Sequence, residues 1–129
     1  MNSIFAKSFI LTGAAGGIGR ALSLALAAEG CGLVLNGRRT EPLDEIKREC
    51  EKTGARVEVV AGSSAMPEVC DALVKNALEL GNFYGFIHAA GVLHPGPVLH
   101  ELPTEAFREI FESSVAGSFQ MARAAFPRL

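Results

Sequence analysis

Hydrophobic residues along this chain gather in short, largely apolar runs that are separated by longer stretches with a different pattern. The runs lie at residues 7–12, 32–36, 56–61 and 85–88. A short apolar run bounded by turn residues is typical of a strand that is buried on both faces of a sheet. The pattern therefore predicts four buried strands.

The stretches between and after these runs have apolar residues at every third or fourth position, which is the spacing of a helix face. They predict helices over residues 17–29, from Thr40 to the glycine at 54, over residues 67–80, and from Thr104 onward. Glycine is common just past a helix end, and Gly30, Gly54 and Gly81 follow the first three. Residues 91–102 contain Pro95, Gly96 and Pro97 and predict a loop.

Strands that alternate with amphipathic helices predict a parallel sheet with helices on both faces and right-handed crossovers. The predicted fold class is therefore doubly wound α/β. The chain has 129 residues, of which 49% are hydrophobic and 20% are charged. That length suits one domain with a real core, and we find no repeat or linker that would divide it. Residues 1–129 are predicted to form a single domain.

The overall charge excludes some classes of partner. The formal net charge is −2 and the isoelectric point is near 5.9, so there is no electrostatic reason to expect nucleic acid or an anionic membrane. Glycines interrupt the apolar stretch near the N-terminus, and no run reaches the roughly 18 residues that a membrane helix needs. We expect a cytoplasmic protein without a nucleic-acid or membrane partner.

The cysteines and histidines do not form a recognisable metal motif. The spacings of Cys31, Cys50 and Cys70 match no zinc or redox motif, so we interpret them as small buried hydrophobic residues in a reducing compartment rather than as catalytic thiols. The histidines, His88, His94 and His100, are spread over a strand end and a proline-containing loop. We expect no metal site there.

A glycine-rich turn follows the first predicted strand. The stretch that contains Thr12, Gly13, Gly17 and Gly19 follows an apolar run and opens a helical pattern. Glycines at such a place permit a tight turn, a close approach of the backbone to a phosphate, and close packing of the helix on the strand. The helix then directs its free N–H groups and positive dipole end at the anion. The turn predicts a pyrophosphate site, and an ordinary glycine-rich turn is the alternative.

Two arginines follow the second predicted strand. A dinucleotide fold that selects NAD has an acidic residue there, about 20 residues past the glycines, whereas this chain has Asn36, Gly37, Arg38 and Arg39. Guanidinium groups bind phosphate oxygens in a two-pronged geometry, which favours NADP(H) over NAD(H). The alternative is a solvated pair of charges. A P-loop is not indicated, because Gly19 is followed by Arg20 and Ala21 and not by lysine and a hydroxyl residue.

These residues resemble the short-chain dehydrogenase/reductase superfamily. Its cofactor motif T-G-x-x-x-G-x-G matches Thr12, Gly13, Gly17 and Gly19 in full. The sequence His-Ala-Ala-Gly at residues 88–91 is similar to the family's N-N-A-G motif, and also to ketoreductase domains of polyketide synthases. The resemblance covers essentially the whole chain. It implies a Rossmann-type sheet with strand order 3-2-1-4, truncated before the fifth strand and therefore incomplete at the C-terminus.

The resemblance also implies a set of cofactor-binding residues. The pyrophosphate would lie against Thr12, Gly13, Ala15, Gly17, Ile18 and Gly19. Arg38 and Arg39 would hold the 2′-phosphate, Ser63 would face the adenine, and Ala89, Ala90 and Gly91 would border the adenosine ribose. Ser63 stands where the family usually has an aspartate.

The family's catalytic machinery has no counterpart in these residues. Ser114 stands where the family has an asparagine that supports the catalytic lysine, and its place on the stripe of Phe107 and Phe111 predicts that it faces inward. A small residue that eases helix packing and bonds its own backbone is the alternative. The family's serine and Tyr-x-x-x-Lys pair are absent, since Tyr84 is the single tyrosine and His88 follows it by four positions.

Two functional hypotheses follow. The chain is the NADP(H)-binding half of a short-chain dehydrogenase/reductase, which would transfer hydride between nicotinamide and a carbonyl or hydroxyl carbon once completed. Alternatively, it is a non-catalytic nucleotide-binding or interaction module. In either case, strand four would be an unpaired apolar edge, and such edges recruit another chain. We therefore expect self-association or pairing with a C-terminal half.

Overall fold

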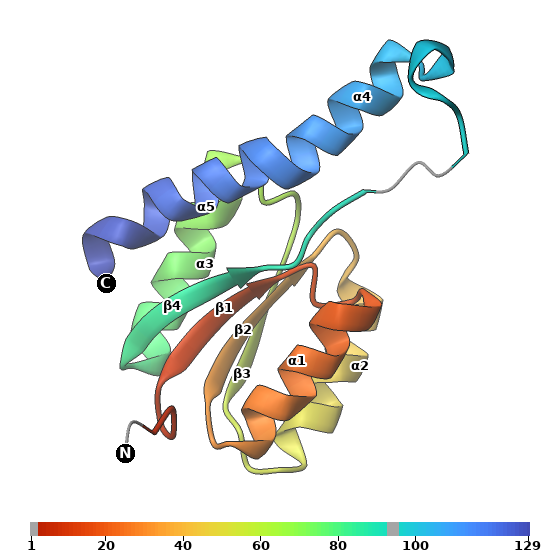
Figure 1. Ribbon diagram of the computed structural model, residues 1–129. Coiled ribbons are helices and arrows are strands. Elements are labelled where there is room, and N and C mark those ends of the chain that lie inside the picture. The colour runs from red at the N-terminus through yellow and green to blue at the C-terminus, as the bar shows by residue number, and fades with distance from the viewer. Residues whose placement is uncertain (1–2, 93–95) are drawn as a thin grey trace.

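The molecule is built on a four-stranded parallel sheet (Figure 1). The computed structural model describes residues 3–92 and 96–129. The strands are β1 (Ser8–Thr12), β2 (Gly32–Gly37), β3 (Val57–Ala61) and β4 (Phe83–His88), and their order in the sheet is β3-β2-β1-β4. The predicted strand order is confirmed.

Helices cover both faces of this sheet, which confirms the doubly wound Rossmann-type fold (Figure 1). On one face lie α1 (Gly17–Ala28) and α2 (Thr40–Glu51). On the other lie α3 (Pro67–Leu80) and α5 (Gly117–Ala125). The α5 helix continues a rod that begins with α4 (Thr104–Phe111) and η2 (Glu112–Ala116), and the short 3₁₀ segments are η1 (Leu99–Glu101) and η3 (Phe126–Arg128).

The alternation of side chains along β1 explains why its sequence is apolar throughout. Successive strand residues point to opposite faces. Phe9 and Leu11 join the core under α1 and α2, whereas Ile10 joins the core under α3 and α5. Strand β2 divides in the same way, and the fully buried Leu35 lies on the first side while Val34 lies on the second.

Two predicted boundaries need correction. Strand β4 begins at Phe83, because Phe83 pairs with Ser8 at the start of β1. The helix expected from Thr104 onward is interrupted by the π-helical turn η2, in which the N–H of Gly117 bonds the carbonyl of Glu112, five residues back. Neither feature has a periodic signature in the sequence.

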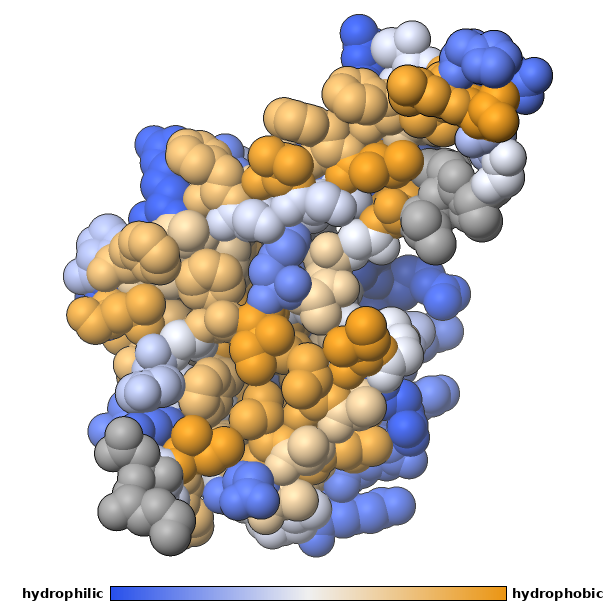
Figure 2. Space-filling model, viewed as in Figure 1, coloured by the Kyte–Doolittle hydropathy of each residue, from blue (hydrophilic) through white to orange (hydrophobic). Residues whose placement is uncertain are grey.

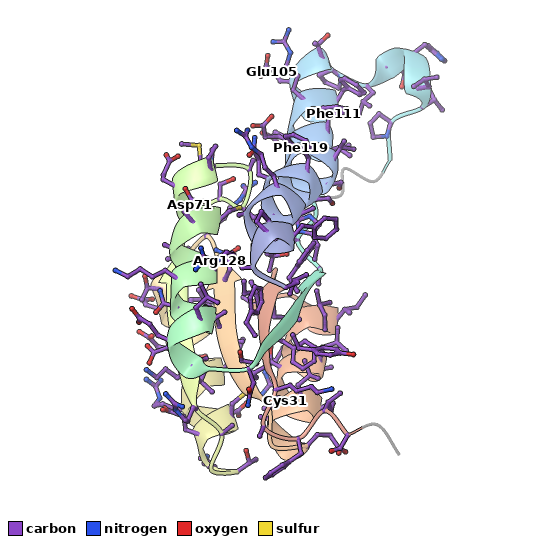
Figure 3. All side chains as sticks on the ribbon, turned by 90° about the vertical axis from the view of Figure 1, so that its left-hand side faces the viewer. Cys31, Asp71, Glu105, Phe111, Phe119 and Arg128 are labelled. Carbon is purple, nitrogen blue, oxygen red and sulfur yellow. The ribbon has the colours of Figure 1, made fainter. Side chains whose placement is uncertain are left out.

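The helical rod extends beyond the sheet, and one of its apolar faces is exposed. Phe107, Phe111, Val115 and Phe119 are each about half exposed, and Figure 3 shows the outer part of the rod standing clear of the sheet. Figure 2 shows hydrophobic residues along this rod and below it, where β4 is the edge strand. We refer to these four residues as the exposed stripe. No helix among the described residues has both the length and the apolar character needed to cross a membrane.

Candidate functional site

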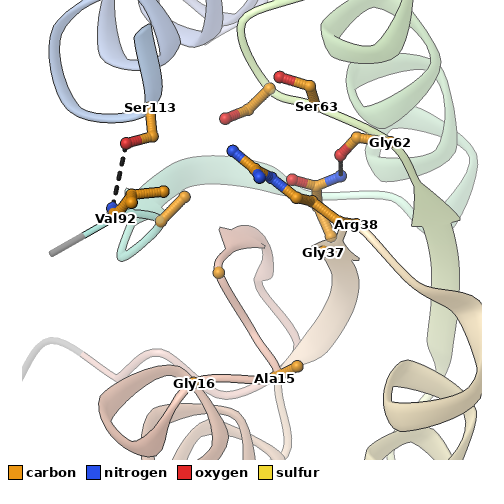
Figure 4. A pocket seen from close by; sticks show the side chains of 13 residues that line it. Ala15, Gly16, Gly37, Arg38, Gly62, Ser63, Val92 and Ser113 are labelled. Carbon is orange, nitrogen blue, oxygen red and sulfur yellow. Dashed lines mark hydrogen bonds between the residues drawn. The ribbon is translucent and has the colours of Figure 1, made fainter. Parts of the chain in front are cut away.

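A cavity of about 260 Å³ lies at the carboxyl ends of the four strands (Figure 4). This is the edge at which open α/β sheets bind ligands. The loops after β1, β2, β3 and β4 and the turn η2 all contribute to its walls. The lining residues are Gly13, Ala15, Gly16, Asn36, Gly37, Arg38, Gly62, Ser63, Ser64, Ala90, Gly91, Val92 and Ser113.

Two of the motif glycines are required by close packing. Gly13 has a positive φ of 66°, and a Cβ added there would lie 2.5 Å from the backbone nitrogen of Ala90. A Cβ at Gly19 would lie 2.0 Å from the carbonyl oxygen of Gly13. These two residues hold the turn against the end of β4 and the helix α1 against the turn.

Gly17 is different, because a Cβ added there would meet nothing within 4 Å. It is the first residue of α1, whose preceding residue Gly16 has no side chain and makes no side-chain cap hydrogen bond. The first turn of α1 also lacks an acidic residue. N–H groups at a helix start are suited to binding an anion, and open space beside Gly17 lets a ligand approach the backbone.

The other residues predicted to contact the pyrophosphate, Ile18, Ala15 and Thr12, differ in their exposure and in whether they line the cavity. Ile18 is 75% exposed at the start of α1, an unusual place for a large apolar side chain. Ala15 lines the cavity. Thr12 is fully buried beneath the turn, and its hydroxyl lies 2.7 Å from Nδ1 of His88 and accepts the N–H of Ala90 at 3.4 Å. Thr12 therefore supports the turn from below and does not line the cavity.

Asn36 is a site residue that the sequence pattern did not single out. It is 2% exposed, and its Nδ2 donates to the carbonyls of Val60 and Gly62 at 2.9 and 3.0 Å. Its own backbone carbonyl accepts the N–H of Ala14 at 2.9 Å. Asn36 thus holds together the ends of β1, β2 and β3. The one signal in the sequence was an amide side chain in an otherwise apolar strand.

The two arginines after β2 are both exposed, but only Arg38 lines the cavity. Figure 4 shows its side chain extending into the cavity. Neither arginine forms an ion pair with any residue in the described part of the chain. Gly37, which precedes them, is in close contact with α2, since a Cβ added there would lie 3.2 Å from Cδ2 of Leu43.

The wall after β3 consists of small residues. Gly62 has a φ of 134°, and a Cβ added there would lie 2.8 Å from Cγ2 of Val69. Ser63, which is predicted to face the adenine, lines the cavity, and its hydroxyl accepts the N–H of Ala65 at 3.2 Å. Ser64 lines the cavity too and was not predicted.

The wall after β4 brings the predicted Ala90 and Gly91 to the cavity. Ala89 does not line it, and its N–H donates to the carbonyl of Thr12 at 3.1 Å. Across from them, Ser113 accepts the N–H of Val92 at 3.1 Å through its hydroxyl.

The inward orientation expected for Ser114 is wrong. Ser114 is exposed, whereas its neighbour Ser113 is 9% exposed and faces the cavity. The stripe of Phe107 and Phe111, from which the expectation came, is itself exposed because no described element packs against it. The hydroxyl of Ser114 lies 3.8 Å from a Cβ added at Gly91, so it stands beside the cavity's β4 wall.

Among the described residues that line the cavity, Arg38 is the one titratable group. Among the described residues, no group of histidine, cysteine, aspartate or glutamate could hold a metal ion, and His94 lies outside those residues. All three cysteines are buried and free, as predicted. Burial raises the pKa of the Cys31 and Cys50 thiols above that of an ordinary thiol and raises the pKa of Cys70 to about 11.

Comparison with known proteins identifies relatives over nearly the full chain. Residues 7–129 match the family model for short chain dehydrogenases. The chain is 37% identical over 125 residues to 1-deoxy-11-beta-hydroxypentalenate dehydrogenase of Streptomyces exfoliatus, covering 95% of this chain and 46% of that protein. It is 31% identical over 121 residues to the phthioceranic/hydroxyphthioceranic acid synthase of Mycobacterium bovis, covering 91% of this chain and 6% of that much longer protein.

Solved structures share the fold. A citronellol catabolism dehydrogenase of Pseudomonas aeruginosa PAO1 superposes with a TM-score of 0.85 at 31% identity, covering 99% of this chain and 53% of that one. NAD⁺-bound xylitol dehydrogenase superposes with a TM-score of 0.91 at 22% identity, covering 98% of this chain and 49% of that one, and so supports the fold alone. The chain spans about half the length of these dehydrogenases.

Proposed function

The chain belongs to the short chain dehydrogenase family, and on that premise we propose that it is the NADP(H)-binding half of an oxidoreductase. The whole enzyme would transfer hydride between the nicotinamide and a carbonyl or hydroxyl carbon. The observation that carries the proposal is the pairing, at one cavity, of Gly16, which directly precedes α1, with the guanidinium of Arg38, which has no ion pair with any described residue. The first residue of α1, Gly17, has open space beside it.

The residues present fit a dinucleotide on physical grounds. The start of α1 offers backbone N–H groups to a pyrophosphate, and the space at Gly17 is what a phosphate needs to reach them. Ile18 would contact the cofactor beside the pyrophosphate, which accounts for its exposure. When bound, the nicotinamide would supply or accept the hydride. The described residues would bind and orient it.

Preference for NADP(H) rests on Arg38. Its guanidinium lies at the cavity, has no ion pair with any residue at positions 3–92 or 96–129, and is preceded by a glycine and not by an acidic residue. A guanidinium can bind a 2′-phosphate through two hydrogen bonds. Arg39 does not line the cavity and serves as the natural comparison.

Hydride transfer to a carbonyl carbon also requires a proton for its oxygen, and we propose that residues other than those described supply it. The single tyrosine, Tyr84, is 56% exposed on β4 and has the Nζ of Lys7 4.0 Å above its ring. It does not line the cavity. We therefore assign cofactor binding to this chain and proton transfer to other residues of the complete enzyme.

The experiment is a fluorescence titration of the 129-residue chain with NADPH and NADH. We expect NADPH to bind more tightly, Arg38→Ala to remove about tenfold or more of that preference, and Arg39→Ala to change it much less. Equal affinity for both cofactors in the parent chain would refute the NADP(H) assignment. Absence of binding to either would refute the proposed function and favour a non-catalytic interaction module.

A further inference from the structure

His88 bridges two parts of the molecule that form opposite walls of the cavity, although it does not line the cavity itself. It is the last residue of β4 and pairs in register with Thr12, the last residue of β1. Its Nδ1 lies 2.7 Å from the Thr12 hydroxyl, and its Nε2 lies 3.0 Å from the carbonyl oxygen of Ser113 in η2. The ring thus spans from the sheet to the helical rod.

The partners determine where the protons of the ring must be. The Ser113 carbonyl can only accept, so Nε2 carries a hydrogen. The Thr12 hydroxyl accepts the N–H of Ala90 and has one proton to donate, and Nδ1 of a neutral ring accepts it. A proton on Nδ1 would leave the Thr12 hydroxyl hydrogen without this acceptor at a position that is fully buried, which is unfavourable.

The π-helical turn η2 supplies the acceptor for this bridge. In a regular α-helix the N–H of Gly117 would bond the carbonyl of Ser113, four residues back. Here it bonds the carbonyl of Glu112, so the Ser113 carbonyl is released from that partner and receives Nε2 of His88. Single π-helical turns of this kind are frequent at functional sites.

Gly117 provides the space that the ring needs. A Cβ added at Gly117 would lie 2.9 Å from Cε1 of His88 and 3.0 Å from Oγ of Ser64. Glycine at this position, the π-helical turn and the histidine therefore form one arrangement. The ring's neighbours in it are the hydroxyl of Thr12, the carbonyl of Ser113 and the α-carbon side of Gly117, all uncharged.

We propose that His88, in its neutral Nε2–H form, is a positioning residue that sets the separation of the glycine turn from the turn η2. Thr12 precedes Gly13 on one wall, and Ser113 holds Val92 on the other. The ring also orients the turn that presents Ser114 beside Gly91. The effect of His88 on cofactor affinity rests on the proposed function. The tautomer of His88 and its energetic coupling to Thr12 do not.

The first test is made on the unmodified ¹⁵N-labelled chain without cofactor. Long-range ¹H–¹⁵N correlations of the imidazole, assigned through the backbone, should show His88 as the Nε2–H tautomer at pH 7.5. An Nδ1–H tautomer, or rapid averaging of the two ring nitrogens, would overturn the proposal. This measurement needs no substitution and is independent of whether the chain binds NADPH.

The second test uses matched variants. His88→Phe keeps a ring and removes both hydrogen bonds, and we expect it to weaken NADPH binding by at least about tenfold. His100→Phe makes the same change at an exposed residue that does not line the cavity. Ser8→Ala removes the hydroxyl of a buried serine, which donates to the carbonyl of Gly81 at the opposite end of β1. Both controls should retain the parent affinity. Unchanged affinity in His88→Phe, or equal loss in Ser8→Ala, would overturn the positioning role.

A double-mutant cycle completes the design. Thr12→Val and His88→Phe should be non-additive in denaturant unfolding, because each removes the same hydrogen bond. Additive effects would overturn the bridge. If the parent chain bound no NADPH, the proposed function would fail, and the tautomer and this cycle would still decide the role of His88.

Discussion

The two helical layers of this molecule are stabilised to different degrees by the residues described. On one face, α1 and α2 pack on the sheet through a cluster that includes Phe9, Leu33 and Leu43. On the other, α3 and α5 pack through a second cluster, but the rod formed by α4, η2 and α5 continues past the sheet and leaves the exposed stripe uncovered. Among the described residues, the sheet covers the core faces of α1 and α2, whereas nothing covers the exposed stripe of the rod.

The two layers differ because their helices carry apolar residues on different numbers of faces. Each helix in the first layer has one apolar face and one sheet face to cover it. The rod has apolar residues on two sides: Met121 and Ala125 are buried in the core, whereas Phe111 and Phe119 point elsewhere. An apolar patch of this kind, next to the unpaired edge of β4, is typical of a surface that another chain covers.

The largest effect is expected from a substitution that disrupts the packing of α1 in the first layer. Gly19→Ala places a Cβ 2.0 Å from the carbonyl of Gly13, so α1 must move away from the turn. We expect a loss of about 3 kcal/mol or more in the free energy of unfolding. Chemical denaturation measures it, with Gly17→Ala as the matched control because its Cβ meets nothing. A loss of less than about 1 kcal/mol in Gly19→Ala would contradict the close packing.

The next prediction tests the uncovered layer. We expect the 129-residue chain to self-associate, as the open edge of β4 predicted, and Phe111→Glu/Phe119→Glu to weaken this by about tenfold or more because two large apolar groups are lost from contact. Analytical ultracentrifugation over a range of concentrations measures the association. Arg123→Glu, a charge change on the exposed side of α5, is the control. A monodisperse parent monomer at every concentration would refute self-association.

A smaller effect separates binding from stability in the first layer. Gly17→Val fills the open space at the start of α1, so we expect NADPH affinity to fall by about tenfold while the unfolding free energy changes by less than about 1 kcal/mol. Titration and denaturation of the same preparation provide both values. Parent-like NADPH affinity in this variant would mean that the phosphate does not approach Gly17.

The smallest expected effect is a difference in thiol reactivity between the cysteines of the two layers. Cys31 and Cys50 are buried in the first layer and Cys70 in the second. Because burial raises the pKa of all three thiols, the reactive thiolate is scarce at pH 8, and its fraction rises only as pH approaches the folded-state pKa, which for Cys70 is about 11. We expect a thiol-specific reagent to label the three cysteines slowly in the native chain and fast after unfolding. Selective rapid labelling of Cys70 at pH 8 would show that α5 opens locally from α3.

Much of the fold was predictable because it depends on short-range patterns. The apolar runs identified the strands, and the glycines that end the helices gave nearly correct bounds. The glycine turn predicted a pyrophosphate site, and part of that turn lines the cavity. The pattern misled where periodicity alone assigned a direction, as for Ser114, because a stripe of phenylalanines was equated with a buried face. The buried serine is Ser113, which lies in the π-helical turn.

The sequence alone determined how strands and helices alternate along the chain. It also determined the turn that only glycine permits at Gly13 and the presence of two candidate arginines. Tertiary structure alone decided that Arg38 and not Arg39 lines the cavity, that Thr12 lies beneath it, and that Asn36 and His88 join distant segments. The physical reason is range. A strand, a helix or a tight turn is specified by neighbours along the chain, whereas a hydrogen bond between residues 24 to 76 positions apart exists only after the sheet has brought them together.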